Sequence, residues 1–548
     1  AWSVAIGRQA LQSFQTGNFN IAVGGFALQA ANGTSNNVAI GQTSMFANTT
    51  GANNVAVGYD SLRSNTTASN NTAVGYQSIY ANTTGTGLTA IGMRALYNNT
   101  TGGGNVAVGG QWDGVSNATL YANTTGANNS AVGVGALANN TTGDANTAIG
   151  YQALVSNTAS NNTAVGYQAG YSNTTGTYNL FFGTQAGYRN STANANYFFG
   201  YTAGYNTTTG GNNVAIGYQT LYGNTTGGSN VALGQQALVS STTASNNSAF
   251  GFTAGYSTTT AVGGVSLGYR AGYSVTTGNY NTMIGAYAGE GAGGAITGAG
   301  NTAVGPSAGA SLTTGSYNSF FGPAGQVNQG SGGLITTGSK NTIIGGYNGN
   351  QGGLDIRIAN NHIVLSDGDG NPRGWFDSGG ALNLGIISSG LYNWTFGGDP
   401  NAQLKGSATQ PDTTQSYAYF NYNFGATRSG YLLWDATSLS LVSTSDYRAK
   451  ENIVDLAGAT ERLKQLKPRK FNFINDPSKT VDGFIAHELG EVIPQAAFGE
   501  KDAVDADGNP VYQAIDPVKL IPLLTAALKE QQAIIESLTA RVSALEGN

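Results

Sequence analysis

The chain has 548 residues, a formal net charge of −5, only 9% charged residues and no cysteine. A length this far beyond one hydrophobic core predicts several structural units. The lack of cysteine excludes a disulfide scaffold and a Cys-ligated metal site. No apolar run approaches the roughly 18 residues of a membrane-spanning helix, and no basic stripe favours a nucleic-acid partner. We therefore expect neither membrane insertion nor nucleic-acid binding.

A short motif, Asn-x-Val-Ala-Ile/Val-Gly, recurs along residues 1–350. Its corner glycine occurs 20 times, from Gly7 to Gly345. The period is about 17 residues, short and regular enough to predict a solenoid. Of the 19 intervals, 15 equal this period, one is shorter by a single position and three carry insertions. The stack would be about 95 Å long at ~4.8 Å per coil. Since Ala1 already lies within a repeat, we expect the natural N-terminus to be missing.

The unit around Gly58 illustrates the role expected of each position. Strand alternation places Val55 and Val57 on one face, which should point to an apolar axis, and Ala56 on the other. Gly58 should form a corner that a side chain would block. The small residue three positions later, here Ser61, indicates tight packing, and asparagines at a fixed offset suggest stacked amide ladders. One narrow coil buries little by itself, so we expect three parallel chains sharing an axis, a homotrimer.

This motif, followed by a small residue, resembles the head repeats of trimeric autotransporter adhesins. Those repeats form a trimeric left-handed parallel β-roll, and they are somewhat shorter than the repeats of this chain. The resemblance implies a trimeric parallel β-solenoid or β-roll here, with a somewhat different coil shape.

Several units depart from the basic pattern. Aromatic triplets at 180–182, 197–199 and 319–321 indicate either a wider core, which we favour, or an exposed ligand patch. An insertion at 111–117 containing Trp112 predicts a projecting loop on a candidate binding face. A surface ladder held by stacking between coils, with sugar stacking as the alternative, is predicted for the tyrosines that follow the corner glycine: Tyr59, Tyr76, Tyr151, Tyr167, Tyr201, Tyr218 and Tyr269.

Residues 351–444 break the period and predict β-hairpins separated by Asp-Gly turns. Asp367, Asp369 and Asn371 have the first spacings of a calcium loop, but no Glu follows at the twelfth position. A turn is therefore the favoured interpretation, and the same holds for Asp505, Asp507 and Asn509. We expect no metal and no cofactor.

Aromatic residues crowd the segment 390–442, which predicts either a small β-rich trimer core or an exposed receptor site at a distal tip. A glycosidase needs two carboxylates at a set separation. The acidic residues available here are Asp377, Asp399, Asp412 and Asp435, and no motif pairs them.

The composition changes class near residue 444, because residues 445–548 hold 28 of the 49 charged side chains. This segment opens with Ser445-Asp446-x-x-x-Lys450 and contains the block Gly-Phe-Ile-Ala-His-Glu at 483–488. It resembles the intramolecular chaperone, auto-processing domain at the C-terminus of phage tail fibres and tailspikes. The resemblance implies that the domain trimerises, assists the folding of the upstream β-structure and then cuts itself off before the serine.

Carried over to this chain, the resemblance implies cleavage between Thr444 and Ser445, with Ser445 as nucleophile and Lys450 as general base. A serine hydroxyl needs such a base, and a lysine can serve only if burial lowers its pKa. His487 and Glu488 would orient the site or pack at a trimer interface. A plainer interpretation of the opening is a helix start with Ser445 or Asp446 as N-cap.

A helix is predicted over 516–546. Its apolar residues are spaced alternately three and four apart, as in the seam of a coiled coil, with one polar exception that could fix the register. The seam comprises Ile521, Leu524, Leu528, Gln531, Ile535, Leu538, Val542 and Leu545.

These patterns predict a mainly β protein with a solenoid shaft (1–350), a β-rich neck or tip (351–444) and a small α+β chaperone domain (445–548) ending in a trimeric coiled coil. The expected function is that of the distal part of a phage tail fibre. Its expected partners are its own copies, upstream tail or baseplate proteins, and a bacterial surface glycan or outer-membrane receptor. It would be assembled in the host cytoplasm and act extracellularly on the virion. A trimeric autotransporter-like adhesin and a glycan-degrading tailspike are the alternatives.

Overall fold

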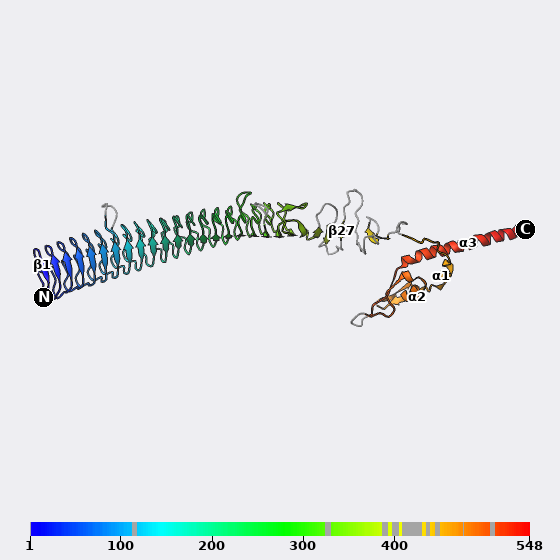
Figure 1. The fold of residues 1–548 in the computed structure, drawn as a ribbon, viewed down its shortest axis with the longest axis horizontal. Coiled ribbons are helices and arrows are strands. Elements are labelled where there is room, and N and C mark those ends of the chain that lie inside the picture. The colour runs from blue at the N-terminus through cyan, green and yellow to red at the C-terminus, as the bar shows by residue number, and fades with distance from the viewer. Residues whose placement is uncertain are drawn as a thin grey trace. The chain divides into compact units, whose positions relative to one another are not determined.

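The computed structural model describes residues 2–111, 118–323, 330–385, 393–396, 405–407, 430–434, 439–443, 450–474, 476–504 and 510–547. The described residues up to Val442 form one compact unit and those from Ser443 onward form another (Figure 1). Within these ranges, no helix combines the length and the apolar character needed to cross a membrane. The predicted residues outside them include Trp112, Asp399, Asp412, Asp435, Thr444, Ser445, Asp446, Asp505, Asp507 and Asn509. Most of the aromatic segment 390–442 also lies outside them, so its interpretation as a trimer core or a receptor site stays a prediction.

The first unit is a parallel β-solenoid, as predicted, in which each coil contributes one short strand to a continuous sheet (Figure 1). Each strand pairs in parallel with the strand of the next coil, as Val55 pairs with Thr72. The strands of the repeat are β1 (Val4–Ile6), β2 (Ile21–Val23), β3 (Val38–Ile40), β4 (Val55–Val57), β5 (Thr72–Val74), β6 (Thr89–Ile91), β7 (Val106–Val108), β8 (Ser130–Val132), β9 (Thr147–Ile149), β10 (Thr163–Val165), β11 (Leu180–Phe182), β12 (Tyr197–Phe199), β13 (Val214–Ile216), β14 (Val231–Leu233), β15 (Ser248–Phe250), β16 (Val265–Leu267), β17 (Thr282–Ile284), β18 (Thr302–Val304), β19 (Ser319–Phe321) and β20 (Thr342–Ile344). A further strand, β23 (Ile363–Ser366), pairs in parallel with β20 and ends the stack.

The interior of a typical coil is filled by the alanine at the strand centre, by a leucine or similar side chain after the corner glycine and by buried amides, rather than by the valine pair. In β4, Ala56 is fully buried and packs in a core that also contains the buried Leu62, whereas Val55 and Val57 are only half-buried. The predicted alternation along the strand is confirmed. The prediction that the valines point to the apolar interior of the coil is wrong, because Ala56 points there and the valines face the other side of the strand. In most coils the strand centre is an alanine that faces the interior, so the β-branched pair on either side of it faces outward.

The corner glycine and the small residue after it behave as predicted. Gly58 has a φ of 136°, and a Cβ there would collide with the carbonyl of Gly75 in the next coil. Ser61 is fully buried, and its hydroxyl donates to the Gly58 carbonyl at 3.0 Å. A larger residue at either position would separate neighbouring coils.

Two buried asparagine ladders run through the shaft and satisfy its polar interior. In the first, which precedes most of the strands, the N–H of Asn71 donates to Oδ1 of Asn54 (3.0 Å), and Nδ2 of Asn54 donates to the Ala68 carbonyl (3.0 Å). In the second, Nδ2 of Asn65 donates to Oδ1 of Asn48 (2.7 Å). The expected amide ladders are therefore present. They supply hydrogen bonds to buried turn carbonyls that would otherwise have no donor.

The three aromatic triplets enlarge the core, as the favoured interpretation held. Their central residues Phe181, Phe198 and Phe320 are fully buried. Four positions after the corner glycine, ordinary coils carry a leucine such as Leu62, but the coil of Phe198 carries Gly204, whose Cβ would collide with the phenyl ring. An alanine–leucine pair is thus exchanged for a phenylalanine–glycine pair, which conserves the packed volume.

Beyond the repeat, the chain turns to antiparallel pairing. β21 (Asn350–Gln351) pairs with β22 (Leu354–Asp355). β24 (Pro372–Phe376), β25 (Leu382–Gly385), β26 (Asn393–Phe396) and β27 (Lys405–Ser407) extend the sheet from β23. β28 (Gly430–Trp434) and β29 (Leu439–Ser443) form a separate sheet.

The Asp367 carboxylate closes the β23–β24 turn, because it accepts hydrogen bonds from the Asn371 N–H and from Arg373. The turn interpretation of this sequence is therefore confirmed.

The second unit is small and contains both helices and short hairpins. It comprises α1 (Ala459–Gln465), β30 (Arg469–Phe473), β31 (Asp476–Gly483), α2 (Ala486–Val492), the short helix η2 (Pro494–Ala496), β32 (Ala497–Phe498), β33 (Ala514–Ile515), the short helix η3 (Pro517–Leu520) and α3 (Ile521–Glu546). Its core joins Ala459 of α1 to Leu489 and Ile493 near α2 and to Leu523 and Ala527 of α3.

Candidate self-processing site and interaction surfaces

Of the predicted dyad and cut site, the structure describes one member, Lys450, which is exposed in the single chain. Thr444 and Ser445 lie outside the described residues. The distance from the hydroxyl to the lysine amine therefore stays a prediction. A lysine acts as a general base only in surroundings that remove it from water, so the exposed position in the single chain does not by itself provide that role.

The predicted orienting residues lie in the first turn of α2. Glu488 receives two hydrogen bonds from Arg469 of β30, at 2.7 Å from Nη2 and 3.1 Å from Nε. Arg469 holds the pKa of the Glu488 carboxyl below its usual range. His487 is half-buried beside it. In this chain Glu488 therefore ties α2 to the β30–β31 hairpin. Whether His487 and Glu488 orient the cleavage site or pack at a trimer interface stays a prediction.

A second carboxylate, Glu530 of α3, was not identified from the sequence. It accepts hydrogen bonds from the backbone N–H groups of Ala459 (2.8 Å) and Thr460 (2.7 Å). Hydrogen bonding from Thr460 first, and then from Ala459, lowers the pKa of Glu530 to about 2. The first turn of α1 has no side-chain cap of its own, since Gly458 precedes it. Glu530 supplies that cap from far along the chain, a pairing that no local sequence pattern reveals.

The match with known families begins at the first residue after the predicted cut. Residues 445–498 match the family described as the chaperone of endosialidase. The matched segment contains Ser445, Lys450, His487 and Glu488. A chaperone segment of this type behind a β-solenoid fits a phage tail fibre or tailspike. No curated protein and no solved structure matches the chain significantly.

The chaperone segment is followed by α3, whose predicted seam is exposed in the single chain. Its apolar members Ile521, Leu524, Leu528, Ile535, Leu538, Val542 and Leu545 are each at least 42% exposed. This apolar ridge extends along the whole helix.

A second exposed apolar surface follows the strands of the solenoid upstream of the chaperone segment. We define the strand stripe as the last apolar residue of each parallel strand, which in the repeat is one position before the corner glycine. Its exposed members are Ile6, Ile40, Ile91, Val132, Ile149, Phe182, Ile216, Leu233, Phe250, Leu267, Phe321, Ile344 and, in β23, Leu365. The stripe therefore runs from the first coil to the last. It is a continuous exposed apolar surface, unlike the single apolar residues that are common on the surface of a monomer.

The tyrosines after the corner glycine stack between coils, as predicted. Tyr59 and Tyr76 have ring centroids 5.6 Å apart at 13°, and Tyr201 and Tyr218 are 5.5 Å apart. In each such pair the two rings cover one face of one another.

A second tyrosine ladder, five positions after the corner glycine, was missed from the sequence. It runs through Tyr171, Tyr188, Tyr205 and Tyr222 with centroid spacings of 5.0 to 5.2 Å. Burial, and then the neighbouring tyrosines, raise the pKa of Tyr188 in its middle. Its signal was a tyrosine recurring at the period of the repeat, the same signal that revealed the first ladder.

Near the C-terminal end of the shaft, irregular segments create a groove of about 450 Å³. It is lined by Ala292, Gly293, Ser311, Leu334, Thr336, Asp355, Arg357 and Ile358. Arg357 donates two hydrogen bonds to the Asp355 carboxylate, at 3.0 and 2.8 Å. None of the lining residues belongs to the strand stripe.

Proposed function

We propose that this chain is the distal shaft of a homotrimeric phage tail fibre, with a C-terminal chaperone that assembles the shaft and then cuts itself off. The observation that carries the proposal is the chaperone match, which starts at Ser445 directly behind the solenoid and its β-rich extension.

Two exposed apolar surfaces on the chain support the homotrimer. The strand stripe spans the solenoid, and the α3 seam spans the last helix. An apolar surface of this length is unfavourable in water. Parallel copies of the chain would each supply an identical stripe at the same height, so every coil would be covered by its own equivalent. The same copies would join their α3 seams in a coiled coil.

Identical repeats explain why such a shaft needs a chaperone. A parallel chain shifted by one coil offers almost the same contacts, so register is weakly specified within the repeat. A trimer formed first at the C-terminus would align the three chains before the coils pair. Once the chaperone is removed, an unfolded shaft could not realign its three chains and refold. The folded trimer would then persist because it unfolds slowly, which is kinetic stability.

Self-cleavage follows from the chemistry of the opening motif. Ser445 Oγ would attack the Thr444 carbonyl carbon while Lys450 takes the hydroxyl proton. Lys450 would return this proton to the Ser445 nitrogen as the peptide bond breaks, which leaves an ester and a free α-amine. Water would hydrolyse the ester to a Thr444 carboxylate and restore the Ser445 hydroxyl. Because Lys450 is exposed in the single chain, its burial would have to come from assembly, which would make cleavage depend on trimer formation.

Intact-mass spectrometry of the expressed chain tests this proposal. We expect a fragment that begins at Ser445 in the wild type and only full-length chain in Ser445→Ala and Lys450→Met. Ser443→Ala, just upstream at the end of β29, is the matched control and should still be cleaved. An assembled wild type that stays unprocessed, or a cleaved Ser445→Ala, would contradict the dyad.

We further propose that the shaft binds a bacterial surface glycan in the groove near its C-terminal end. A carboxylate, a guanidinium and the hydroxyls of Ser311 and Thr336 can bond a polyhydroxylated ligand, while Leu334 and Ile358 offer apolar contact. Because no lining residue of the groove belongs to the strand stripe, we expect the groove to stay accessible in a trimer built on that stripe.

A glycan array with the full chain tests this assignment. Arg357→Gln should reduce binding at least about tenfold, the scale of a charge-assisted hydrogen bond. Arg373→Gln, which changes an exposed arginine of β24 that pairs with Asp367, should leave binding unchanged. Equal binding by both variants would exclude the groove, and turnover of the bound glycan would favour a degrading tailspike.

A further inference from the structure

The interior of the shaft has one coil, around β16, where both packing rules of the solenoid fail together. In the first asparagine ladder, the position before β16 is Gly264 instead of asparagine. At the centre of β16, Ser266 replaces the usual alanine, and the position four after the corner glycine is Gly272 rather than leucine. Neither partner of this pair is large. The preceding coil also pairs two small residues, Ala249 and Gly255, but it keeps its ladder asparagine, Asn247, so the two departures coincide at β16.

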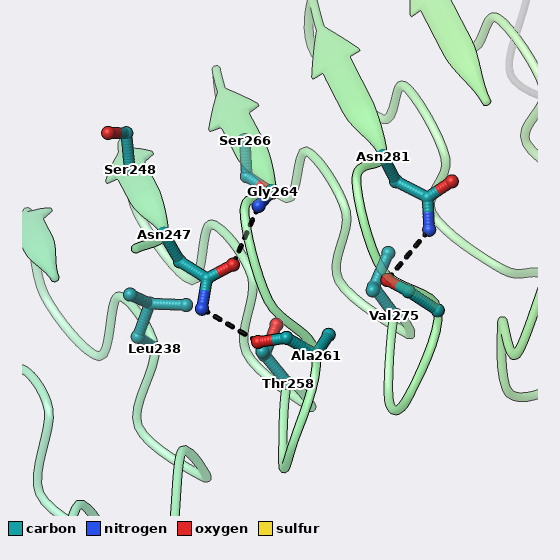
Figure 2. Close-up of a pocket in the computed structure, with 10 residues that line it drawn as sticks. Leu238, Asn247, Ser248, Thr258, Ala261, Gly264, Ser266, Val275 and Asn281 are labelled. Atoms are coloured by element: carbon teal, nitrogen blue, oxygen red, sulfur yellow. Dashed lines mark hydrogen bonds between the residues drawn. The ribbon is translucent and has the colours of Figure 1, made fainter. Parts of the chain in front are cut away.

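A small cavity lies at this defect (Figure 2), with about 10 Å³ open to the centre of a water molecule. Ser266, Gly278 and Asn281 are among the residues that line it. A space of this size holds one water when two or more polar groups face it.

The hydrogen bonds of the regular ladder show what an ordinary coil has at this place. The ladder asparagine accepts the N–H of the next asparagine, as Asn230 accepts the N–H of Asn247 at 3.0 Å. Its Nδ2 also donates to a turn carbonyl of the next coil, as Asn230 does to Ala244 at 2.8 Å. One amide side chain therefore bridges a backbone donor and a backbone acceptor.

The coil of β16 has no amide for this bridge. The equivalent partners of position 264 are the N–H of Asn281 and the carbonyl of Gly278, and Gly264 has no side chain for either of them. The Gly278 carbonyl accepts from the Nδ2 of Asn281 at 2.9 Å (Figure 2). A carbonyl oxygen has two lone pairs, so Gly278 can accept a second hydrogen bond where the regular ladder supplies one.

The apolar core divides at the same place. Contacts between buried apolar side chains run without a break from Ala22 to Ala254 and again from Ala261 to Val364, as two separate clusters. A solenoid gains its stability from neighbouring coils, so a coil with weakened contacts on its interior marks a boundary between cooperative blocks.

We propose that this cavity binds one ordered water, which replaces the missing amide by accepting from the Asn281 N–H and donating to the Gly278 carbonyl. The hydrated coil joins two blocks of the shaft that open independently, β1–β15 and β17–β23. The site recognises water rather than a larger ligand, because its volume admits nothing bigger.

Hydrogen exchange of the full chain, followed by mass spectrometry, tests the proposal. Wild-type peptides spanning β16 and β17 should exchange about tenfold faster than those spanning β13 and β14, where the ladder is regular. Gly264→Asn should slow the exchange at β16 and β17 by about the same factor, because the added amide supplies both hydrogen bonds. The backbone at Gly264 is not left-handed, and its nearest neighbour to a new Cβ is the Asn247 Oδ1 at 3.1 Å.

Gly25→Asn is the matched control, since a Cβ there meets nothing closer than 4.0 Å and Gly25 lies outside the ladder. It should leave exchange at β16 and β17 unchanged. Uniform exchange along the wild-type shaft would overturn the proposed boundary between the two blocks at β16. This comparison requires no variant to fold. A density map of the full chain that shows an empty cavity at Gly264 would overturn the water site.

Discussion

At the scale of single residues, two interior positions of a coil share its packed volume. They are the strand centre and the position four after the corner glycine, and a large side chain at one accompanies a small residue at the other in the coils of Phe198 and Ala215. Ala215 and Leu221 share one coil, and Phe198 and Gly204 share the coil before it. Leu221 has a φ of 52° and Gly204 a φ of 61°, so leucine already adopts this left-handed backbone in the fold. The glycine at 204 is therefore required by the phenyl ring and not by the backbone.

This exchange predicts a rescue. Phe198→Ala should lower the free energy of unfolding by about 3–5 kcal/mol because it leaves a cavity. Gly204→Leu should also destabilise, because its side chain would overlap the ring. The double variant should regain most of the loss, since it recreates the alanine–leucine pair. Denaturant unfolding of the three variants checks this, and purely additive losses would contradict volume exchange.

At the scale of elements, the long helix α3 holds the chaperone segment together through one carboxylate. Glu530 caps the start of α1 and has a pKa of about 2, well below its ordinary 4.5. A lowered carboxyl pKa contributes stability that is complete above pH 4.5 and is lost as the pH falls toward 2. The same helix presents its apolar seam outward on another face.

Glu530→Gln should therefore destabilise the chaperone segment at pH 7. The variant should also lose less stability than the wild type as the pH falls from 4.5 toward 2. Thermal unfolding followed by the helical circular dichroism signal, at pH 7, 5 and 3, measures both effects. Glu536→Gln on the same helix, whose partner is the nearby Gln532, is the control and should change little. Identical pH profiles for wild type and Glu530→Gln would refute the role of the cap.

At the scale of the whole molecule, the strand stripe predicts how copies associate. Ile216→Asp together with Leu233→Asp places two charges on the stripe, and burial of unpaired charge in a shared axis is costly. We expect light scattering to show three copies for the wild type and fewer, or aggregated, chains for this variant. Thr226→Asp, an exposed turn residue in the same coil as Ile216, should remain trimeric. A monomeric wild type would contradict the homotrimer.

The solenoid and the chaperone segment could be predicted because their signals are local and repeated. The regular spacing of the corner glycine determined the parallel stack, and a carbonyl in the next coil explains why Gly58 must lack a side chain. The block from Ser445 to Glu488 likewise indicates its family by itself, because its residues carry that family's spacing.

Tertiary structure alone decided which side of each strand is inside. Alternation separates Val57 from Ala56 but does not say which one a narrow coil encloses, and only closure of the coil placed the alanine within. It also decided that Glu530 caps α1, because a contact between residues so far apart in the chain leaves no periodic trace. The boundary proposed at Gly264 rests on the sequence and on the tertiary structure together. The sequence shows the missing asparagine, and the packing shows the cavity beside it.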